Sequence, residues 1–142
     1  MQEYIALLGA MTGGFLVLMG DHIRRKVERK QTEVNRLVEA SAQLSSTYNR
    51  LCGELLDAAE HGVAVTDLPS ADPQRYEVAT RFFMTPGSER LRSSGARLIA
   101  SYTALRAGYA QGHRWDEARV EHGAAVREFE EAVRAVMRRQ HI

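Results

Sequence analysis

An uncharged apolar run near the N-terminus constrains this chain more than any other feature. Its 17 residues, 4–20, read YIALLGAMTGGFLVLMG and contain no charged side chain. At about 1.5 Å per residue a helix of this length spans roughly 25 Å, slightly less than the ~30 Å hydrocarbon core of a bilayer. The run therefore predicts either a short transmembrane helix or a helix buried inside a protein assembly.

The flanks of this run favour a membrane anchor over a secretory signal peptide. A signal peptide begins with positive charge and ends at a small-residue cleavage site, whereas Glu3 precedes this run and Asp21 follows it. Because the basic residues lie on the C-terminal side, the positive-inside rule places the N-terminus outside and the rest of the chain in the cytoplasm. We expect a single-pass protein of the cell inner membrane. Its predicted parts are a short external tail (1–3), a transmembrane helix (4–20) and a cytoplasmic helical bundle (21–142).

Small residues gather on one side of this predicted helix. The spacing Gly9-x-x-x-Gly13 is the minimal form of a motif that lets two transmembrane backbones approach closely. Glycine is also common in such helices without any pairing role, so this alternative stays open. The prediction is that the chain packs against itself or another membrane protein through Ala6, Gly9, Ala10, Gly13 and Gly14.

A basic segment follows the apolar run directly. Side chains of this kind lie close to the anionic headgroups of the inner leaflet, where each is worth about 1 kcal/mol. A chain that runs out, back and out again would bring the turn at 112–115 to the same surface, where tryptophan is common. The residues predicted to contact the membrane surface are Arg24, Arg25, Lys26, Arg29, Lys30 and Trp115.

The residues after the basic segment follow a seven-residue repeat. Spacings of three and four between apolar side chains predict an amphipathic helix with a coiled-coil-like face, which could be continuous with the apolar run from about residue 3 to 60. One seam of this face is Val27, Val34, Ser41, Tyr48 and Leu55, and the other is Lys30, Leu37, Leu44, Leu51 and Ala58.

Two breaks divide the rest of the chain. His61-Gly62 resembles a helix end and Asp72-Pro73 a helix start, while Thr85-Pro86 resembles a second cap with proline in the first turn. The sequence therefore predicts an all-α fold, in which an N-terminal transmembrane helix continues into an antiparallel three-helix bundle with coiled-coil-like packing. The expected helices cover about 21–60, 73–110 with a break near 85, and 114–140.

Charge is distributed in blocks of alternating sign, although the net charge is only +1. The region 37–72 is acidic, 73–114 is basic, and 115–131 is acidic again. Such blocks fit helices that choose neighbours of complementary charge better than they fit one basic face for nucleic acid. We therefore expect no nucleic-acid binding, although the arginines of 90–106 are the best candidates for it.

Residues that could carry chemistry are scattered. The five histidines form no pair at ligand spacing, and His122 falls on an apolar seam, where a packing role is expected. Cys52 is the only cysteine, so no disulfide forms within the chain, and it has no base beside it in sequence. There is no phosphate-binding glycine loop and no nucleophile elbow. The sequence predicts no catalytic residue, metal ligand, cofactor or small-molecule substrate.

The layout resembles a loose class of small single-pass membrane proteins of unknown function from high-GC Gram-positive bacteria. The matching pieces are Gly13-Gly14, Arg24-Arg25-Lys26 and the segment 135–139, AVMRR. This resemblance implies a membrane location but no activity and no functional residue.

Three hypotheses about function follow. The first is a non-enzymatic, membrane-anchored helical adaptor or accessory subunit of a membrane complex that associates with itself. The second is a soluble structural protein of a phage or secretion-type assembly, whose apolar N-terminal helix packs between subunits. The third, a small enzyme using His122 or Cys52, would need these side chains to meet other histidines and carboxylates in a pocket.

Overall fold

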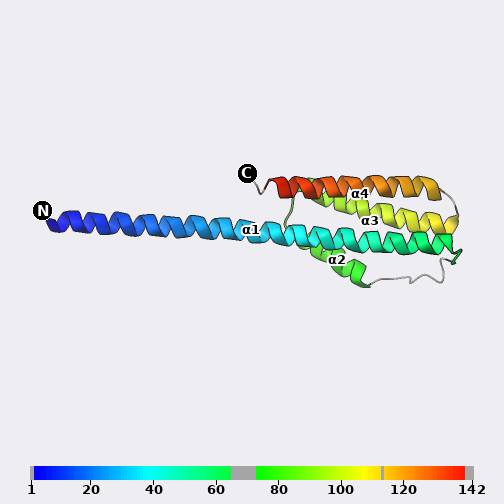
Figure 1. Ribbon diagram of the computed structural model, residues 1–142, viewed down its shortest axis with the longest axis horizontal. Helices are drawn as coiled ribbons and strands as arrows, with labels where there is room; N and C mark the ends of the chain where they lie inside the picture. Colours follow the sequence, from blue (N-terminus) through cyan, green and yellow to red (C-terminus); the bar gives the residue numbers. More distant parts are fainter. Residues whose placement is uncertain (1, 65–72, 113, 140–142) are drawn as a thin grey trace. The chain divides into compact units, whose positions relative to one another are not determined.

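The computed structural model describes residues 2–64, 73–112 and 114–139, and it describes side chains from Leu18 onward. These residues form four helices and no strand, which confirms the predicted all-α class (Figure 1). The helices are α1 (Gln2–Glu60), α2 (Pro73–Met84), α3 (Glu89–Gln111) and α4 (Trp115–Arg138).

The chain divides into two compact units, Met1–Asn35 and Arg36–Ile142. In the first unit the described side chains from Leu18 to Glu33 are exposed. Most of the predicted transmembrane helix, residues 4–17, lies outside the part whose side chains are described. Within the described part no helix is long and apolar enough to cross a membrane, so the structure gives the predicted anchor no support.

The seam of α1 begins later than the seven-residue repeat suggested. Val27 and Lys30 are exposed and Val34 is half-buried, so the prediction that the first two contribute to packing within the chain is wrong. From Leu37 onward the predicted positions are buried, and Ser41 among them donates its hydroxyl to the Leu37 carbonyl at 2.7 Å. A polar side chain is tolerated there because its hydrogen bond is satisfied within the helix.

The second unit is a bundle in which successive helices run in opposite directions. Arg81 of α2 bonds to Gln43 of α1, and Gln74 at the other end of α2 bonds to Arg50, so α2 is antiparallel to α1. Tyr48 and Tyr102 pair edge to face at 5.4 Å, and Tyr109 bonds to the Ala58 carbonyl, so α3 is parallel to α1. α4 is antiparallel to α3, as the ion pair Arg97–Glu128 and the ring contact Tyr109–Trp115 show.

The chain reverses direction at 85–88, where the sequence predicted a break or kink within one helix. The predicted three-helix bundle is therefore wrong in detail, because the region 73–110 forms two antiparallel helices in place of one. Thr85 ends α2, since its amide and its hydroxyl both donate to the Arg81 carbonyl. The cap of α3 is Ser88, whose side chain accepts from the Leu91 amide, and not Thr85 as expected. Pro86, which has no amide hydrogen, lies in the connection between them.

The core draws on all four helices. Phe82 of α2 and Phe129 of α4 meet edge to face with their centroids 5.6 Å apart, a favoured geometry for aromatic pairs. An apolar ladder along α3 is buried, and Tyr109 at its end is partly buried; the buried members are Leu91, Gly95, Leu98, Tyr102 and Leu105. Burying these side chains drives the fold. The buried apolar cluster consists of Leu37, Leu44, Tyr48, Leu51, Leu55, Val78, Phe82, Leu91, Leu98, Tyr102, Leu105, Ala118, Phe129 and Ala132.

The ion pairs of the described residues lie mostly within single helices, at spacings of three or four. Arg97 of α3 and Glu128 of α4 form a pair between helices. Arg81 and Arg50 of the bundle reach across α1 and α2 to amide side chains, Gln43 and Gln74, in place of carboxylates. The prediction that helices of opposite charge lie side by side is thus met in part, by a direct ion pair between α3 and α4.

Candidate functional site

The N-terminal residues predicted to bind partners are only partly described. The small-residue face of Ala6, Gly9, Ala10, Gly13 and Gly14 lies outside the described side chains. The five basic residues from Arg24 to Lys30 are all exposed, and Arg24 pairs with Glu28 at 3.0 Å across one helical turn. Apolar side chains are exposed among them, namely Leu18, Met19, Ile23 and Val27.

Trp115 lies elsewhere than the sequence led us to expect. Its ring is half-buried and packs on Tyr109 of α3, with the centroids 5.4 Å apart. The Tyr109 hydroxyl lies within hydrogen-bond distance of the carbonyls of Ala58 and Val63, which places this turn beside the C-terminal end of α1. The expected position beside the beginning of the bundle is wrong, because the extra reversal at 85–88 exchanges the two ends. Trp115 therefore loses the geometric reason for a membrane contact.

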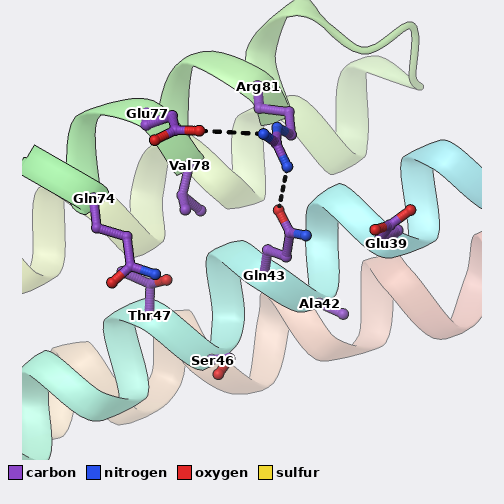
Figure 2. A pocket seen from close by; sticks show the side chains of 9 residues that line it. All are labelled: Glu39, Ala42, Gln43, Ser46, Thr47, Gln74, Glu77, Val78 and Arg81. Atoms are coloured by element: carbon purple, nitrogen blue, oxygen red, sulfur yellow. Dashed lines mark hydrogen bonds and ion pairs between the residues drawn. The ribbon is translucent and has the colours of Figure 1, made fainter.

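A groove of about 500 Å³ runs between α1 and α2 (Figure 2). Because α2 has only 12 residues, it covers α1 along a short stretch. Val78 is the buried apolar residue of this groove, and polar side chains line most of the remainder. The lining residues are Glu39, Ala42, Gln43, Ser46, Thr47, Gln74, Glu77, Val78 and Arg81.

Arg81 organises one end of this groove. Its guanidinium donates to the side-chain amide oxygen of Gln43 at 3.1 Å and to the Glu77 carboxylate at 3.2 Å, as the dashed lines of Figure 2 mark. One side chain thereby joins α1 to α2 while its charge is balanced within α2. Towards the other end, Arg50 contacts Gln74 at 3.4 Å and Glu54 at 2.7 Å. The groove therefore offers hydrogen-bonding groups and balanced charge, which suits a polar polypeptide surface.

A buried polar pair joins α3 to α4. Ser101 Oγ lies 2.9 Å from His122 Nδ1 and donates its single hydroxyl proton to the Leu98 carbonyl at 2.8 Å. The serine oxygen must then accept a hydrogen bond from Nδ1–H, which fixes neutral His122 in the Nδ1–H tautomer. His122 is 4% exposed, and its Nε2 atom is buried without a hydrogen-bond partner.

Burial has a direct electrostatic consequence for this pair. Desolvation of the imidazolium lowers the pKa of His122 below its ordinary value of 6.5. The rings of Tyr102 and His122 meet at 6.3 Å, and burial raises the pKa of Tyr102 as well. The expected packing role of His122 is confirmed, because it lies in the core between helices.

The other candidate residues stay apart in the structure. His61 is exposed and lies 3.4 Å from Asp57, one helical turn before it, while His113 and His141 lie outside the described residues. Cys52 is half-buried against the core, and burial raises the pKa of its thiol, which lowers its nucleophilicity at neutral pH. Among the described residues no group of histidine, cysteine and carboxylate side chains could hold a metal ion.

Comparison with known proteins identifies no relative. No family model, no curated protein and no solved structure matches this chain. The resemblance to small single-pass membrane proteins therefore stays a prediction.

Sequence reasoning missed both the groove and the buried pair. His122 was placed on an apolar seam, whereas Ser101 was not among the positions expected to face inward, although it follows Leu98 by three residues. Their meeting depends on the relative register of α3 and α4, which periodicity within one helix does not give. The groove depends in turn on the reversal at 85–88.

Proposed function

We propose that this protein is a non-enzymatic, membrane-anchored helical adaptor or accessory subunit of a membrane complex. Residues 4–20 would form the anchor in the cell inner membrane, with the N-terminus outside. The helical bundle would lie in the cytoplasm and bind partner proteins. The observation that carries the proposal is a 17-residue uncharged run followed by five exposed basic side chains on the same helix, α1.

The exposed apolar side chains at the end of the run and just after it support an anchor. Leu18, Met19 and Ile23 are exposed within the chain, although transfer of such side chains from water to an apolar environment is favourable by about 1.5–3 kcal/mol each. Insertion of the run 4–20 would place Leu18 and Met19, at its end, in or near the hydrocarbon region. The small-residue face that includes Gly9 and Gly13 would then allow two anchors to pack closely.

The basic side chains supply the second part of the attachment. Arg25, Lys26 and Arg29 are exposed and would reach anionic headgroups of the inner leaflet. A span slightly shorter than the bilayer core gains from such flanking cations, which hold its end at the interface. The basic side chains would thus bind anionic lipid, and the small-residue face of the anchor would bind a second anchor.

The bundle supports a binding role through its surface. Arg81 donates hydrogen bonds to both Gln43 and Glu77 in the α1–α2 groove, so these three side chains define a fixed surface of donors and acceptors. A fixed polar surface beside buried Val78 suits recognition of a partner polypeptide.

Membrane attachment is tested in bacterial cells that express the full chain. We expect the wild type to sediment with membranes, to resist carbonate extraction and to float with lipid. Exchanging Leu8 and Phe15 for arginine should release the chain, whereas Met137→Arg, an equivalent change on an exposed part of the bundle, should not. A wild-type chain that stays soluble and monodisperse would refute the anchor.

The orientation and the self-contact need separate measurements. Trypsin added to spheroplasts should leave the arginine-rich bundle intact and should digest it in inside-out vesicles. A photoreactive residue at position 13, followed by mass spectrometry, would identify what packs against Gly13 in cells. Crosslinks to a second copy or to another membrane protein are the expected result, and crosslinks to soluble proteins alone would oppose it.

A soluble structural protein of a phage or secretion-type assembly is the second candidate. What favours it is that the bundle itself exposes large apolar side chains, among them Met84 and Val120. Large oligomers that form without detergent and without lipid would support this role over the membrane adaptor.

A further inference from the structure

The outer face of α2 carries an apolar stripe that the bundle does not cover. Tyr76, Phe83 and Met84 lie on this face at helical spacing and are exposed, Tyr76 by 59% and Met84 by 79%. The opposite face of the same helix buries Val78 and Phe82 in the core. α2 is thus apolar on both sides, and among the described residues only one side is covered by the rest of the bundle.

Arginines lie at both ends of this stripe. The Arg75 guanidinium stacks over the Tyr76 ring at 4.9 Å and donates to its hydroxyl at 3.0 Å. The Arg92 guanidinium donates to the Phe83 carbonyl at 3.3 Å, which holds it against the end of α2. Such a surface fits a partner that presents an apolar side chain surrounded by carboxylates.

The N-terminal half of α4 presents a surface of that description. Val120 is 71% exposed, and it lines a shallow hollow of about 460 Å³ together with Asp116, Glu117 and Glu121. Arg114 lies 3.8 Å from Glu117, and the hollow remains acidic overall. The hollow therefore presents an apolar side chain beside acidic ones, whereas the stripe on α2 presents apolar side chains beside basic ones.

The Met84 end of the stripe and the acidic hollow belong to opposite ends of the bundle. Gly87, just beyond Met84, approaches Leu37 near the beginning of the bundle's α1 segment, whereas Trp115 packs on Tyr109 beside the end of α1. A stripe and a hollow that are separated in this way can meet only between two copies of the chain.

We propose that the stripe on α2 of one copy binds the acidic hollow on α4 of a second copy. Because the two surfaces differ, each copy keeps one of them unused and can add a further copy, so the contact is heterologous and produces growth in one direction. This self-contact is independent of the membrane anchor. The small surfaces correspond to the weak end of specific interfaces, and confinement of the chains at high local concentration would increase their occupancy.

The test uses sedimentation velocity of the full chain in mild detergent, from about 10 µM to about 1 mM, a range suited to a small interface. Met84→Glu places a carboxylate in the stripe, and Val120→Arg places a cation in the hollow. Met137→Glu is the matched control, since it makes the same change on exposed α4 outside both surfaces. Circular dichroism melts verify that each variant keeps the wild-type fold.

We expect the sedimentation coefficient of the wild type and of Met137→Glu to rise with concentration, and that of either interface variant to rise clearly less, because only association through the anchor remains. An equimolar mixture of Met84→Glu and Val120→Arg should restore association, because each contributes the surface that the other lacks. About 1 M salt should weaken the wild-type association. A wild type without concentration dependence, an effect of only one substitution, or a mixture that stays dissociated would each overturn the proposal. Vesicle flotation of both variants should equal that of the wild type, which separates this result from the anchor.

Discussion

Gly95 of α3 lies directly against the ring of Phe82 of α2. A Cβ atom built on Gly95 would be 2.4 Å from Phe82 Cε1 and 3.4 Å from the ring of Phe129. Real carbon atoms do not approach to 2.4 Å, so the absence of a side chain at this position allows the aromatic pair to fill the centre of the bundle.

This contact predicts that Gly95→Ala destabilises the protein. Overpacking of a filled core typically costs about 1–3 kcal/mol, and we expect the free energy of unfolding in urea to fall by that amount. Gly53→Ala is the control, because a Cβ at Gly53 meets no atom within 4 Å on an exposed part of α1. It should stabilise the helix by about 0.5–1 kcal/mol. Equal effects of the two substitutions would contradict the packing argument.

His122 predicts a loss of stability in acid. The pKa of His122 is lowered in the folded chain below its ordinary value of 6.5. Just below pH 6.5 the imidazole is therefore protonated in the unfolded chain but still neutral in the folded chain. Stability should therefore be constant above that pH with respect to this group. As the pH falls further, stability should decrease with a limiting slope of about 1.4 kcal/mol per unit, until the folded pKa is reached.

Urea unfolding between about pH 7.5 and about pH 4.5 measures this slope. His122→Leu should remove this contribution and leaves every other titratable side chain in place, so the difference between the two curves isolates the buried imidazole. Direct titration of the His122 ring signal by NMR should give a value below 6.5. A variant curve parallel to that of the wild type would show that His122 titrates normally.

Ser88 predicts a capping contribution at the start of α3. Its side chain accepts a hydrogen bond from the Leu91 amide at 3.3 Å, with an extended backbone typical of an N-cap. Ser88→Ala should lower the free energy of unfolding by about 1 kcal/mol. Ser93→Ala, on the exposed face of the same helix, should have no such cost, since alanine is the better helix former. Thr85→Ala would be the costly change if Thr85 were the cap.

The ion pair between Arg97 and Glu128 should contribute little. Their side chains are 57% and 42% exposed, and double-mutant cycles of exposed pairs give about 0.2–1 kcal/mol. We expect a cycle built on Arg97→Ala and Glu128→Ala to give a coupling energy in this range, and about 1 M salt to reduce it. A coupling energy well above 1 kcal/mol would mean that the charge blocks drive the packing of α3 on α4.

The amino-acid sequence by itself determined the helical class and most inward-facing positions. Leu44, Tyr48 and Leu98 fall on periodic apolar seams, and each is buried in the structure. Periodicity is a local property of one helix, so it reports which face is apolar without reference to any partner. For the same reason it placed Val27 on the seam, although the buried seam begins only at Leu37 and Val27 is exposed in the described structure.

Only the tertiary structure decided which faces meet and at which end of the bundle. The segment 85–88 reads as a break in the sequence, and whether a break bends or reverses a chain depends on what the flanking helices can bury. Reversal lets Phe82 enter the space above Gly95 and brings Ser101 opposite His122. These contacts join residues that are distant in sequence, so no pattern within a single helix reveals them. The free energy of these contacts selects the four-helix arrangement.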